Sequence, residues 1–521
     1  MSTQKYGLGK QDFASLRERG FVYVDKTQYI IKLLEGSDCY FLSRPRRFGK
    51  SLFLSTLEYF FLGRRDLFQG LAIENYDWDW AAFPIVRINL GEGSFSSPGG
   101  LTNRLIEIVE DLEDKYKIPS RGSDPRGRLR NIILKLREKE GKGVIILVDE
   151  YEKPLLDAID KPYFEEYRGI LHDFYSVFKN NEESIRFLFI TGVTRFGHLN
   201  IFSGLNNLRD LSFSEEFSGI CGIMEAELTE TLRPGIERFA EKQELTYDAA
   251  VKSLKKYYDG YHFSESMIDI YNPFSLLGCL TESKISTNWF ESGSASFLVG
   301  LLQEKDYDLT DIEGVEVLAS RLKTIPPALD DPIPLLYQSG YLTIKKYSKE
   351  SGLYRLGYPN YEVKNGMLEI LVPYYLGKPS NSVDFPLVRI KAWIEGGEIK
   401  QFMEWLSGLF ADLSYDVNAK DEREFRNAIY FIFNFIGFRE GLTVEKRIAT
   451  GRIDMVLESR ERVYIFEFKV GHSPEEAIRQ IRERGYAEPY RGKGKKVYAI
   501  GVSFNPYRRI IEDYRIEEMQ D

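Results

Sequence analysis

The chain contains few of the residues on which several protein classes depend. Its three cysteines, Cys39, Cys221 and Cys279, are too few and too widely spaced for a disulfide framework or a zinc cluster. The four histidines are isolated from one another, which argues against histidine-rich metal sites and against Cys–His nucleophile pairs. These scarcities predict a protein of the reducing cytoplasm.

Long apolar runs and a basic excess are also missing. No apolar run approaches the ~18–20 residues that are needed to cross a bilayer. The amino terminus lacks a basic segment followed by an apolar one, so we expect neither a membrane partner nor a secretory leader. The formal net charge of −9 argues against a wholly basic nucleic-acid-binding surface, although it is compatible with a local one.

The bulk composition is that of an ordinary globular protein. Hydrophobic residues make up 43% of the 521 residues and charged residues 29%, which supplies enough apolar material for cores of full size. At ~150 residues per domain, a chain of this length predicts about three domains. We predict these domains at residues 1–225, 226–380 and 381–521.

Residues 40–51 have the pattern of a phosphate-binding loop. An apolar run predicts a strand, a turn with proline and glycine follows, and a helical pattern begins at Lys50-Ser51. In such a loop the backbone N–H groups hold the phosphates, Lys50 reaches the β- and γ-oxygens and Ser51 binds Mg²⁺. Arg44 stands where the general pattern G-x-x-x-x-G-K-[ST] has its first glycine. The predicted nucleotide contacts are Arg44, Arg46, Arg47, Phe48, Gly49, Lys50, Ser51 and Leu52.

A second apolar segment, residues 144–148, ends in the acidic pair that such a loop requires. The segment fits a strand buried on both faces of a parallel sheet, and Asp149-Glu150 follow it. Strands and helices alternate around it, which predicts an α/β layer whose ligands bind beyond the carboxyl ends of the strands. We expect Asp149 to hold Mg²⁺ and Glu150 to orient and deprotonate the attacking water. The alternative is an ordinary strand that ends in two solvated acids.

The next apolar run, residues 185–190, ends in Thr191-Gly-Val-Thr-Arg195. Thr191 or Thr194 is a candidate sensor of the γ-phosphate, and a simple Thr-Gly turn is the alternative. Arg195 is a candidate for stabilising transition-state charge, in cis or from a neighbouring subunit. The alternative for Arg195 is an ordinary solvent-facing arginine.

Residues 215–380 carry no strong chemical signal. Asn272-Pro273 predicts the start of a helix, with Asn272 as the N-cap. From residue 332 the pattern indicates helix, strand, turn, strand and helix, which resembles a winged-helix module. Because its charges are mixed, a packing role is favoured over contact with nucleic acid. Asp259 and Asn272 are expected to be structural rather than catalytic.

The carboxyl-terminal part contains a series of predicted strands. Residues 442–447, 451–457 and 463–470 indicate three successive strands, and a helical pattern follows them. Both faces of the third strand are apolar except for Glu467 and Lys469. These two charges therefore lie where burial is costly.

A hairpin between the last two of these strands brings acidic residues together. If it turns at residues 460–461, Asp454 lies opposite Glu467, with Cβ atoms ~4.5–5.5 Å apart. A divalent cation with oxygen ligands, Mg²⁺ or Mn²⁺, would relieve the repulsion between the two carboxylates. Lys469 would then position a water or stabilise the pentacovalent phosphate. The alternative is a salt-bridged patch of Asp, Glu and Lys.

The spacing Asp-x₁₂-Glu-x-Lys on paired strands after a helix resembles the core of PD-(D/E)XK nucleases. The motif proline is absent, because Arg-Ile precedes Asp454. The resemblance implies an additional acid, for which Glu424 on the preceding helix is the best candidate and Glu445 a weaker one. Gln480 and Tyr486 stand where such nucleases often carry helper residues, and a structural role is the alternative.

Residues 479–509 form a locally basic segment of this acidic chain. They include nine lysines and arginines but only two acids. Such an excess predicts contact with a phosphate backbone.

Motifs along nearly the whole chain resemble one prokaryotic family, the AAA-ATPase-like proteins with a C-terminal PD-(D/E)XK nuclease domain. The family itself carries arginine at the position of Arg44. The resemblance implies an α/β fold: an N-terminal P-loop NTPase with a parallel sheet and helices on both faces, a middle helical lid and winged-helix-like region, and a C-terminal restriction-endonuclease-like domain. The motifs are Asp25–Thr27, Arg44–Ser51, Val148–Pro154, residues 201–206, Tyr257–Tyr261, Tyr271–Phe274, Gly451–Asp454 and Tyr464–Lys469.

We therefore predict an ATP-binding and ATP-hydrolysing protein coupled to a Mg²⁺- or Mn²⁺-dependent nuclease. Nucleic acid, with DNA favoured over RNA, is the expected partner, and the resemblance suggests roles in defence against foreign DNA or in mobile elements. Homo-oligomerisation through the ATPase domain is left open. The alternative function is an ATP-switched nucleic-acid-binding or regulatory protein with an inactive nuclease fold.

Overall fold

The computed structural model of the chain divides into two compact units. The first unit combines Met1–Ser292 with Glu313–Val363, and the second combines Gly293–Ile312 with Lys364–Asp521. The structure describes residues 4–195, 205, 207–287, 312–323, 331–375, 387–411, 422–435, 438, 441–448, 450–505, 507 and 510–519, with backbone only for 370–375, 387, 388, 422–424 and 435.

The first unit is built on a parallel sheet of five strands. Its order is β2-β3-β4-β1-β5, so β4 lies between β1 and β3. All six residues of β3 are buried, as the sequence predicts for a strand covered on both faces. The strands are β1 (Cys39–Ser43), β2 (Ile85–Asn89), β3 (Val144–Asp149), β4 (Ile185–Gly192) and β5 (Arg209–Asp210).

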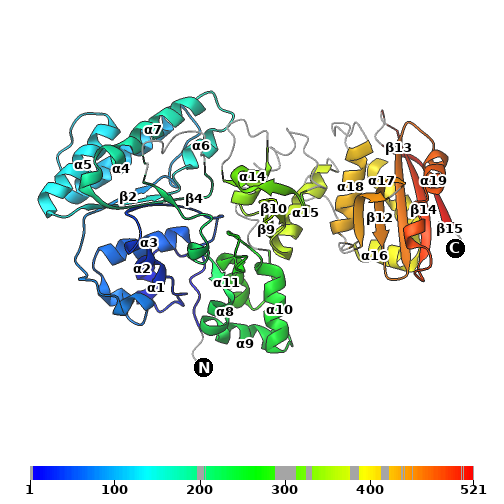
Figure 1. Cartoon of the computed structure of the whole chain (residues 1–521), viewed down its shortest axis with the longest axis horizontal. Coiled ribbons are helices and arrows are strands. Elements are labelled where there is room, and N and C mark those ends of the chain that lie inside the picture. The colour runs from blue at the N-terminus through cyan, green and yellow to red at the C-terminus, as the bar shows by residue number, and fades with distance from the viewer. Residues whose placement is uncertain are drawn as a thin grey trace. The chain divides into compact units, whose positions relative to one another are not determined.

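Helices cover both faces of this sheet, which confirms the predicted α/β layer. Figure 1 shows α4, α5, α6 and α7 on one face and α1, α2 and α3 on the other. Short 3₁₀ turns, Arg65–Phe68, Ala72–Asn75 and Glu182–Ser184, join these elements. The helices are α1 (Phe13–Glu18), α2 (Gln28–Leu34), α3 (Lys50–Phe61), α4 (Gly100–Tyr116), α5 (Pro125–Glu140), α6 (Lys153–Ala158) and α7 (Phe164–Asn180).

A helical subdomain follows the sheet within the same unit. Leu228, Phe239, Leu254 and Leu276 are among the residues of its core, and Tyr6 from the amino-terminal segment packs into that core. The side-chain amide oxygen of Asn272 accepts from the backbone N–H groups of Phe274 and Ser275, so the predicted N-cap is confirmed. The elements are Glu215–Phe217 (3₁₀), β6 (Ile223–Met224), α8 (Glu225–Thr231), α9 (Arg233–Lys242), α10 (Tyr247–Tyr258), β7 (Ile270–Tyr271) and α11 (Pro273–Glu282).

The predicted helix–hairpin–helix pattern after residue 332 is also present. Its three strands are antiparallel in the order β8-β10-β9. The elements are β8 (Glu316–Leu318), α13 (Ala319–Leu322), α14 (Ile333–Gln338), β9 (Thr343–Ser348), β10 (Leu353–Gly357) and α15 (Tyr361–Tyr375). Identification of this group as a winged-helix module stays a prediction.

The second unit contains a mixed sheet in the order β11-β12-β13-β14-β15. Only the β13–β14 pair is parallel, because α19 connects these two strands across one face of the sheet. Stacked aromatic rings, including Phe425 on Phe504 at 4.0 Å, join α18 to the other face. The elements are α16 (Leu387–Gly396), α17 (Ile399–Ala411), α18 (Glu422–Phe435), β11 (Leu442–Ile448), β12 (Gly451–Glu458), β13 (Arg462–Val470), α19 (Pro474–Glu483), Glu488–Tyr490 (3₁₀), β14 (Lys496–Asn505) and β15 (Ile510–Met519).

The sequence predicts three domains, whereas the structure separates only two compact units. The compact first unit includes residues of both the predicted first and second domains, and the predicted boundary at residue 380 lies outside the described residues. The division therefore stays a prediction.

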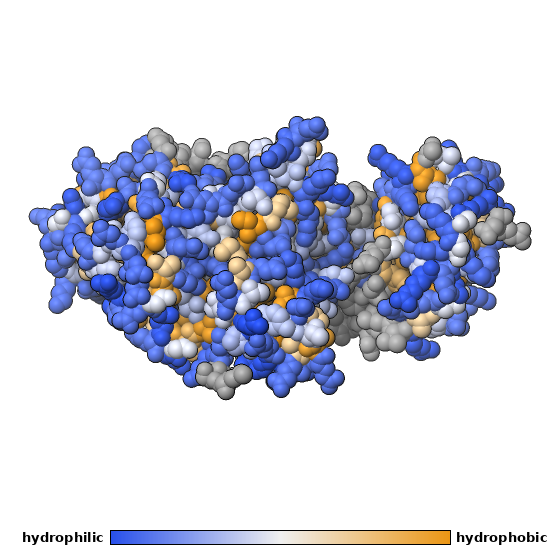
Figure 2. Space-filling model, turned by 60° about the horizontal axis from the view of Figure 1, so that its bottom comes forward, coloured by the Kyte–Doolittle hydropathy of each residue, from blue (hydrophilic) through white to orange (hydrophobic). Residues whose placement is uncertain are grey.

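The surface carries few large apolar side chains. Figure 2 shows a face that is mostly hydrophilic, with hydrophobic side chains in scattered groups. Within the described part of the chain, every helix is too short or too polar to cross a bilayer.

Candidate functional site

The loop between β1 and α3 folds around its own lysine. The Lys50 ammonium donates to the carbonyl oxygens of Arg44 and Pro45 at 2.8 and 3.0 Å. Gly49 has φ +91° and Arg47 has φ +68°, both in the left-handed region, which lets the loop turn tightly into the helix. Burial lowers the pKa of Lys50, and the negative charges of Asp149, Glu152 and Glu150 act in the opposite direction.

A cavity of about 470 Å³ opens beside this loop, a size within the usual range for small-molecule sites. The predicted catalytic base Glu150 lines it, and so do seven of the predicted nucleotide contacts: Arg46, Arg47, Phe48, Gly49, Lys50, Ser51 and Leu52. Side chains from the amino-terminal segment, 220–223 and α11 complete the walls, which the loop motif did not predict. These lining residues include Leu8, Lys10, Val22, Val24, Lys26, Ile223, Phe274 and Leu277.

Arg44 does not line this cavity. It is buried, and its guanidinium donates to the carbonyl oxygens of Ser43, Ser212 and Phe217 at 2.9, 2.8 and 3.2 Å. It also lies 4.1 Å from the ring centroid of Phe263. A contact between Arg44 and a nucleotide would require these bonds to break, because all of them hold the guanidinium inside the protein. In this structure Arg44 holds the loop in place.

Asp149 is the last residue of β3 and Glu150 follows it, and the structure places their two side chains in different surroundings. Asp149 is buried and accepts from the Thr191 hydroxyl at 2.6 Å. Glu150 has φ +50° and lines the cavity. A Cβ at Gly91 would lie 2.7 Å from Glu150 Oε2, so the absence of a side chain at Gly91 makes room for the carboxylate.

Thr191 and Arg195 lie outside the cavity lining in this structure. The hydroxyl of Thr191 is engaged by Asp149. The Arg195 guanidinium forms an ion pair with Asp210, and its backbone N–H donates to Gln338 Oε1 at 2.7 Å. Their predicted contacts with a triphosphate stay predictions.

Glu152 is a buried acid that sequence reasoning did not single out. Its Oε1 accepts from the backbone N–H groups of Val193 and Thr194, at the end of β4. Burial raises the pKa of Glu152 to about 7, against the effect of these hydrogen bonds and of Lys50. A glutamate three residues after a strand usually belongs to a solvated turn. The neighbouring sequence therefore gives no indication that Glu152 is buried.

The second unit brings Asp454 and Glu467 together. The β12–β13 register pairs Met455 with Phe466, and its continuation by one residue places Asp454 opposite Glu467, as predicted from the hairpin. Asp454 is 7% exposed and Glu467 1%. The Phe468 N–H donates to Asp454 Oδ2 at 2.9 Å.

Lys469 completes this group. Its ammonium donates to Glu467 Oε1 at 2.9 Å. Burial raises the pKa of Asp454, whereas the Phe468 N–H and the charges of Lys469 and Arg426 lower it. Two buried carboxylates on facing strands fit a hard divalent cation, which prefers oxygen ligands and offsets their mutual repulsion.

The additional candidates of the nuclease-like core have other contacts. Glu424 lies in α18, and its side chain is outside the described residues. Glu445 forms ion pairs with Arg426 and with Arg452. Gln480 donates to the Tyr486 hydroxyl at 3.3 Å, and that hydroxyl donates to the carbonyl oxygen of Arg452 at 2.9 Å. These bonds attach α19 to β12, and a catalytic role for either residue stays a prediction.

The basic segment at residues 479–509 is less basic in space than along the chain. Four of its described cations form ion pairs with acids of neighbouring strands or of the same turn, because β12 and β15 bring carboxylates alongside. These pairs are Arg482–Glu517, Arg491–Glu488, Lys495–Glu458 and Lys496–Glu518. A phosphate-backbone contact would have to compete with them.

Comparisons with known proteins agree with this architecture. A family model described as "Predicted AAA-ATPase" matches residues 7–202, and one described as "PD-(D/E)XK nuclease superfamily" matches residues 420–514. The chain is 33% identical over 534 aligned positions to the "Uncharacterized protein in vnfD 5'region" of Azotobacter chroococcum mcd 1. That alignment covers 100% of each protein.

The buried carboxyl of Glu152 predicts a pH dependence of stability. Its pKa is raised to about 7 in the folded protein, so its stabilising contribution is complete below the unfolded-state pKa of ~4.5 and is lost as the pH rises to about 7. Glu152→Gln keeps an acceptor for both N–H groups and carries no charge. Relative to the parent, the variant should gain roughly 2–4 kcal/mol between pH ~5 and ~8.

Thermal unfolding by calorimetry across this pH range measures the effect. Glu183→Gln, an exposed glutamate, serves as the matched control and should follow the parent. An unchanged difference between Glu152→Gln and the parent at all pH values would contradict the expectation.

Proposed function

This chain belongs to the family of proteins that join an AAA-ATPase-like domain to a domain of the PD-(D/E)XK nuclease superfamily, and on that premise we propose that it hydrolyses ATP and cleaves nucleic acid. The observation that carries the proposal is the second site: Asp454, Glu467 and Lys469 meet on a buried hairpin in a chain that also has a lysine-serine loop beside a nucleotide-sized cavity.

At the first site, different groups of the protein bind the phosphates and promote hydrolysis. The N–H groups at the start of α3 hold the phosphates, and Lys50 exchanges its bonds to the Arg44 and Pro45 carbonyls for bonds to phosphate oxygens. Glu150, at the cavity wall, accepts the proton of the attacking water. Ser51 and Asp149 would hold Mg²⁺, which neutralises charge on the phosphates.

At the second site, hydrolysis adds water to a phosphodiester and breaks one P–O bond. Asp454 and Glu467 would hold Mg²⁺ or Mn²⁺, which supplies Lewis-acid activation of the phosphate and of water. Lys469 is held by Glu467, so its ammonium is positioned to stabilise negative charge on the phosphoryl oxygens. Glu424 is proposed as the additional acid of this site.

Loss of the Lys50 ammonium should weaken nucleotide binding. We expect Lys50→Ala to weaken ATP binding at least ~10-fold, because a charge-assisted contact to phosphate is removed. Glu150→Gln should bind ATP normally but lose roughly 10²–10⁴-fold in kcat, because general-base catalysis is lost. Fluorescent-nucleotide titration and phosphate release measure the two effects.

Lys252→Ala, which removes an exposed lysine of α10, is the control and should leave both quantities unchanged. Full ATP affinity in Lys50→Ala would exclude the cavity as the triphosphate site.

The space at Gly91 allows a milder test of Glu150. Gly91→Ala places a methyl group against the end of the Glu150 side chain, which is free to shift because it is flexible. Hydrolysis should fall roughly 10–100-fold through misplacement of the carboxylate, while the ATP Kd and thermal stability stay near those of the parent. Unchanged phosphate release would show that Glu150 does not act from its present position.

The nuclease site is tested by removing Asp454. With Mg²⁺ or Mn²⁺, the parent should cleave plasmid, linear or single-stranded DNA, or RNA, and Asp454→Ala should lose at least ~10²-fold in rate because a metal ligand is lost. Glu461→Ala, an exposed acid at the β12–β13 turn, is the control. Parallel digests with and without ATP, and with Lys50→Ala, show whether the first site controls cleavage.

A parent protein that binds these substrates in an ATP-dependent manner but cleaves none of them would favour the alternative function. The chain would then be an ATP-switched binding or regulatory protein with an inactive nuclease fold.

A further inference from the structure

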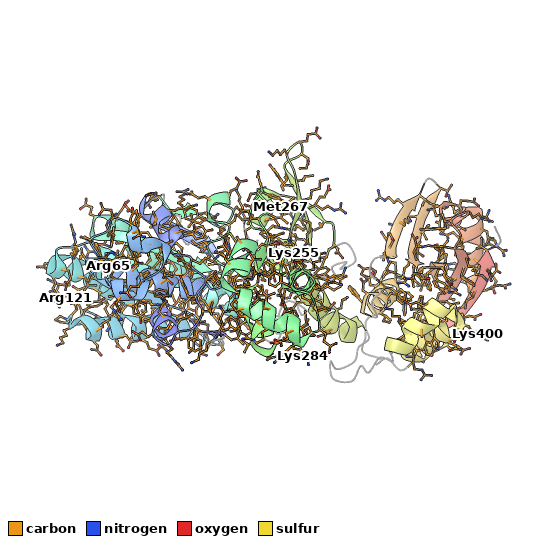
Figure 3. The ribbon with its side chains drawn as sticks, turned by 90° about the horizontal axis from the view of Figure 1, so that it is seen from below. Arg65, Arg121, Lys255, Met267, Lys284 and Lys400 are labelled. Atoms are coloured by element: carbon orange, nitrogen blue, oxygen red, sulfur yellow. The ribbon has the colours of Figure 1, made fainter. Side chains whose placement is uncertain are left out.

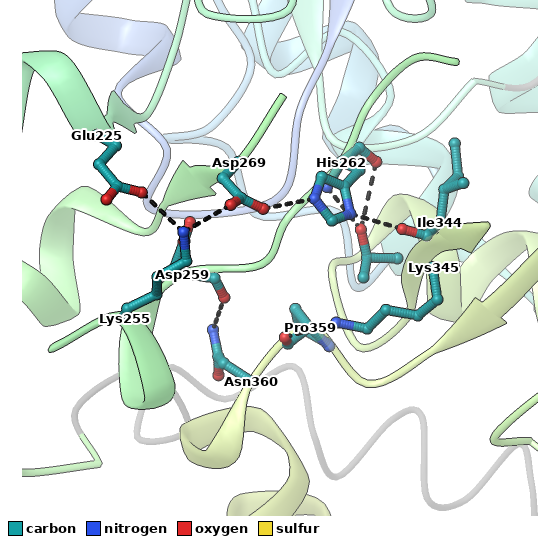
Figure 4. Close-up of polar contacts among 10 residues, drawn as sticks. Glu225, Lys255, Asp259, His262, Asp269, Ile344, Lys345, Pro359 and Asn360 are labelled. Atoms are coloured by element: carbon teal, nitrogen blue, oxygen red, sulfur yellow. Dashed lines mark hydrogen bonds and ion pairs between the residues drawn. The ribbon is translucent and has the colours of Figure 1, made fainter. Parts of the chain in front are cut away.

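Three carboxylates that belong neither to the phosphate-binding loop nor to the Asp454–Glu467 group meet in the helical subdomain. Glu225 is the first residue of α8, Asp259 follows α10, and Asp269 precedes β7 (Figure 4). One oxygen from each lies within 4.8 Å of the others. Their exposure differs: Glu225 is exposed, Asp269 is partly buried and Asp259 is buried.

Asp259 is the unusual member of this group. Its side chain is 1% exposed, and neither of its carboxylate oxygens receives a hydrogen bond within the described part of the chain. Burial raises the pKa of Asp259 to about 7, against the effects of the nearby backbone N–H of Gly260 and of the Lys255 charge. A buried carboxylate without hydrogen bonds is costly, and a bound ion is one of the few arrangements that compensates for it.

The nearest cation, the Lys255 ammonium, lies farther from Asp259 than from the other two carboxylates. The Lys255 ammonium lies 2.7 Å from Glu225 Oε2 and 2.9 Å from Asp269 Oδ2, but 3.6 Å from Asp259 Oδ2. Lys255, which is labelled in Figure 3, belongs to α10, and its side chain is 43% exposed. A lysine with this much freedom can move to solvent, because its four-carbon stem is flexible.

The other basic side chains nearby have partners other than Asp259. His262 Nε2 contacts Asp269 Oδ1 at 2.7 Å, and its Nδ1 contacts the carbonyl oxygen of Ile344 at 2.7 Å. The Lys345 ammonium donates to the carbonyl oxygen of Pro359 at 2.8 Å. Of the three carboxylates, Asp259 therefore has the weakest contacts with positive or hydrogen-bonding groups. It also faces the two other carboxylates of the cluster.

We propose that Glu225, Asp259 and Asp269 bind a divalent cation of the hard, oxygen-preferring class, in competition with the Lys255 ammonium. Carboxylate oxygens at this mutual spacing suit Ca²⁺, whose ligands lie ~2.3–2.6 Å from the ion and whose geometry is flexible. Waters complete the coordination on the exposed side, where Glu225 lies. Displaced Lys255 returns to solvent.

The location gives such a cation a structural consequence. The segment after Asp259 carries Tyr261 and Phe263, whose rings pack edge-on against Phe48 of the phosphate-binding loop at 4.8 and 5.5 Å. An ion at the cluster would join α8, the end of α10 and the residues before β7. It would thereby fix the start of the segment that contacts this loop.

Terbium luminescence tests the proposal, because Tb³⁺ replaces Ca²⁺ and is excited through nearby tyrosines such as Tyr258 and Tyr271. The full chain with Asp454→Ala and Glu467→Ala, without nucleotide, removes the metal ligands of the nuclease site. In this background we expect a saturable signal that Ca²⁺ displaces. Adding Asp259→Asn should lower the Tb³⁺ affinity at least ~10-fold, since a charged ligand is lost.

Lys255→Ala provides the decisive comparison. Removing the competing ammonium should raise the Tb³⁺ affinity, whereas a lysine that merely holds the cluster together would give lower affinity when removed. Asp248→Asn, an exposed aspartate of α10, is the matched control and should change nothing. A thermal melt without metal shows whether Asp259→Asn is folded.

Three results would overturn the proposal. They are the absence of a saturable signal in the background protein, an Asp259→Asn variant that binds Tb³⁺ as tightly as the background, and a Lys255→Ala variant that binds it more weakly.

Discussion

The buried ammonium of Lys50 is the charge around which the carboxyl edge of the parallel sheet is arranged. Burial alone disfavours the charged form, and the carboxylates of Asp149, Glu152 and Glu150 compensate for it. They can do so because β4 lies between β1 and β3, so the acids that follow β3 reach the lysine across the end of one strand. The same acids hold that strand end: Asp149 binds Thr191, and Glu152 binds the N–H groups after it.

The phosphate-binding loop is tied to the helical subdomain by aromatic and cationic contacts. Arg44 donates to three carbonyl oxygens and lies over Phe263, while Phe48 packs edge-on against Tyr261 and Phe263. Lys26 adds a buried ion pair with Glu227 of α8. A change at the loop therefore displaces the segment around Tyr261, because close-packed rings transmit movement rather than absorb it.

In the second unit, the two faces of β13 carry different kinds of side chain. One face of the strand carries Phe466 and Phe468, which pack with the aromatic side chains of α18 and β14. The opposite face carries Glu467 and Lys469, which partner each other and Asp454 across the hairpin. Burying an acid-rich group costs free energy, and a protein retains such a group when its chemistry is needed.

The sequence by itself determined the features that depend on local pattern. Hydrophobic runs located β1, β3 and β4, alternation on the third predicted strand identified Glu467 and Lys469, and a two-residue turn was sufficient to set Asp454 opposite Glu467. These predictions succeed because strand periodicity and hairpin register are properties of neighbouring residues.

The tertiary structure alone decided the features that depend on distant parts of the chain. It turned Arg44 into the interior, buried Glu152 beneath the end of β4, and set acids of β12 and β15 beside the basic segment that had looked unopposed. It also gathered Glu225, Asp259 and Asp269, which lie on three separate elements. The physical reason is that burial and the charge around a side chain are set by whichever elements pack against it, and residue spacing along the chain carries no record of those partners.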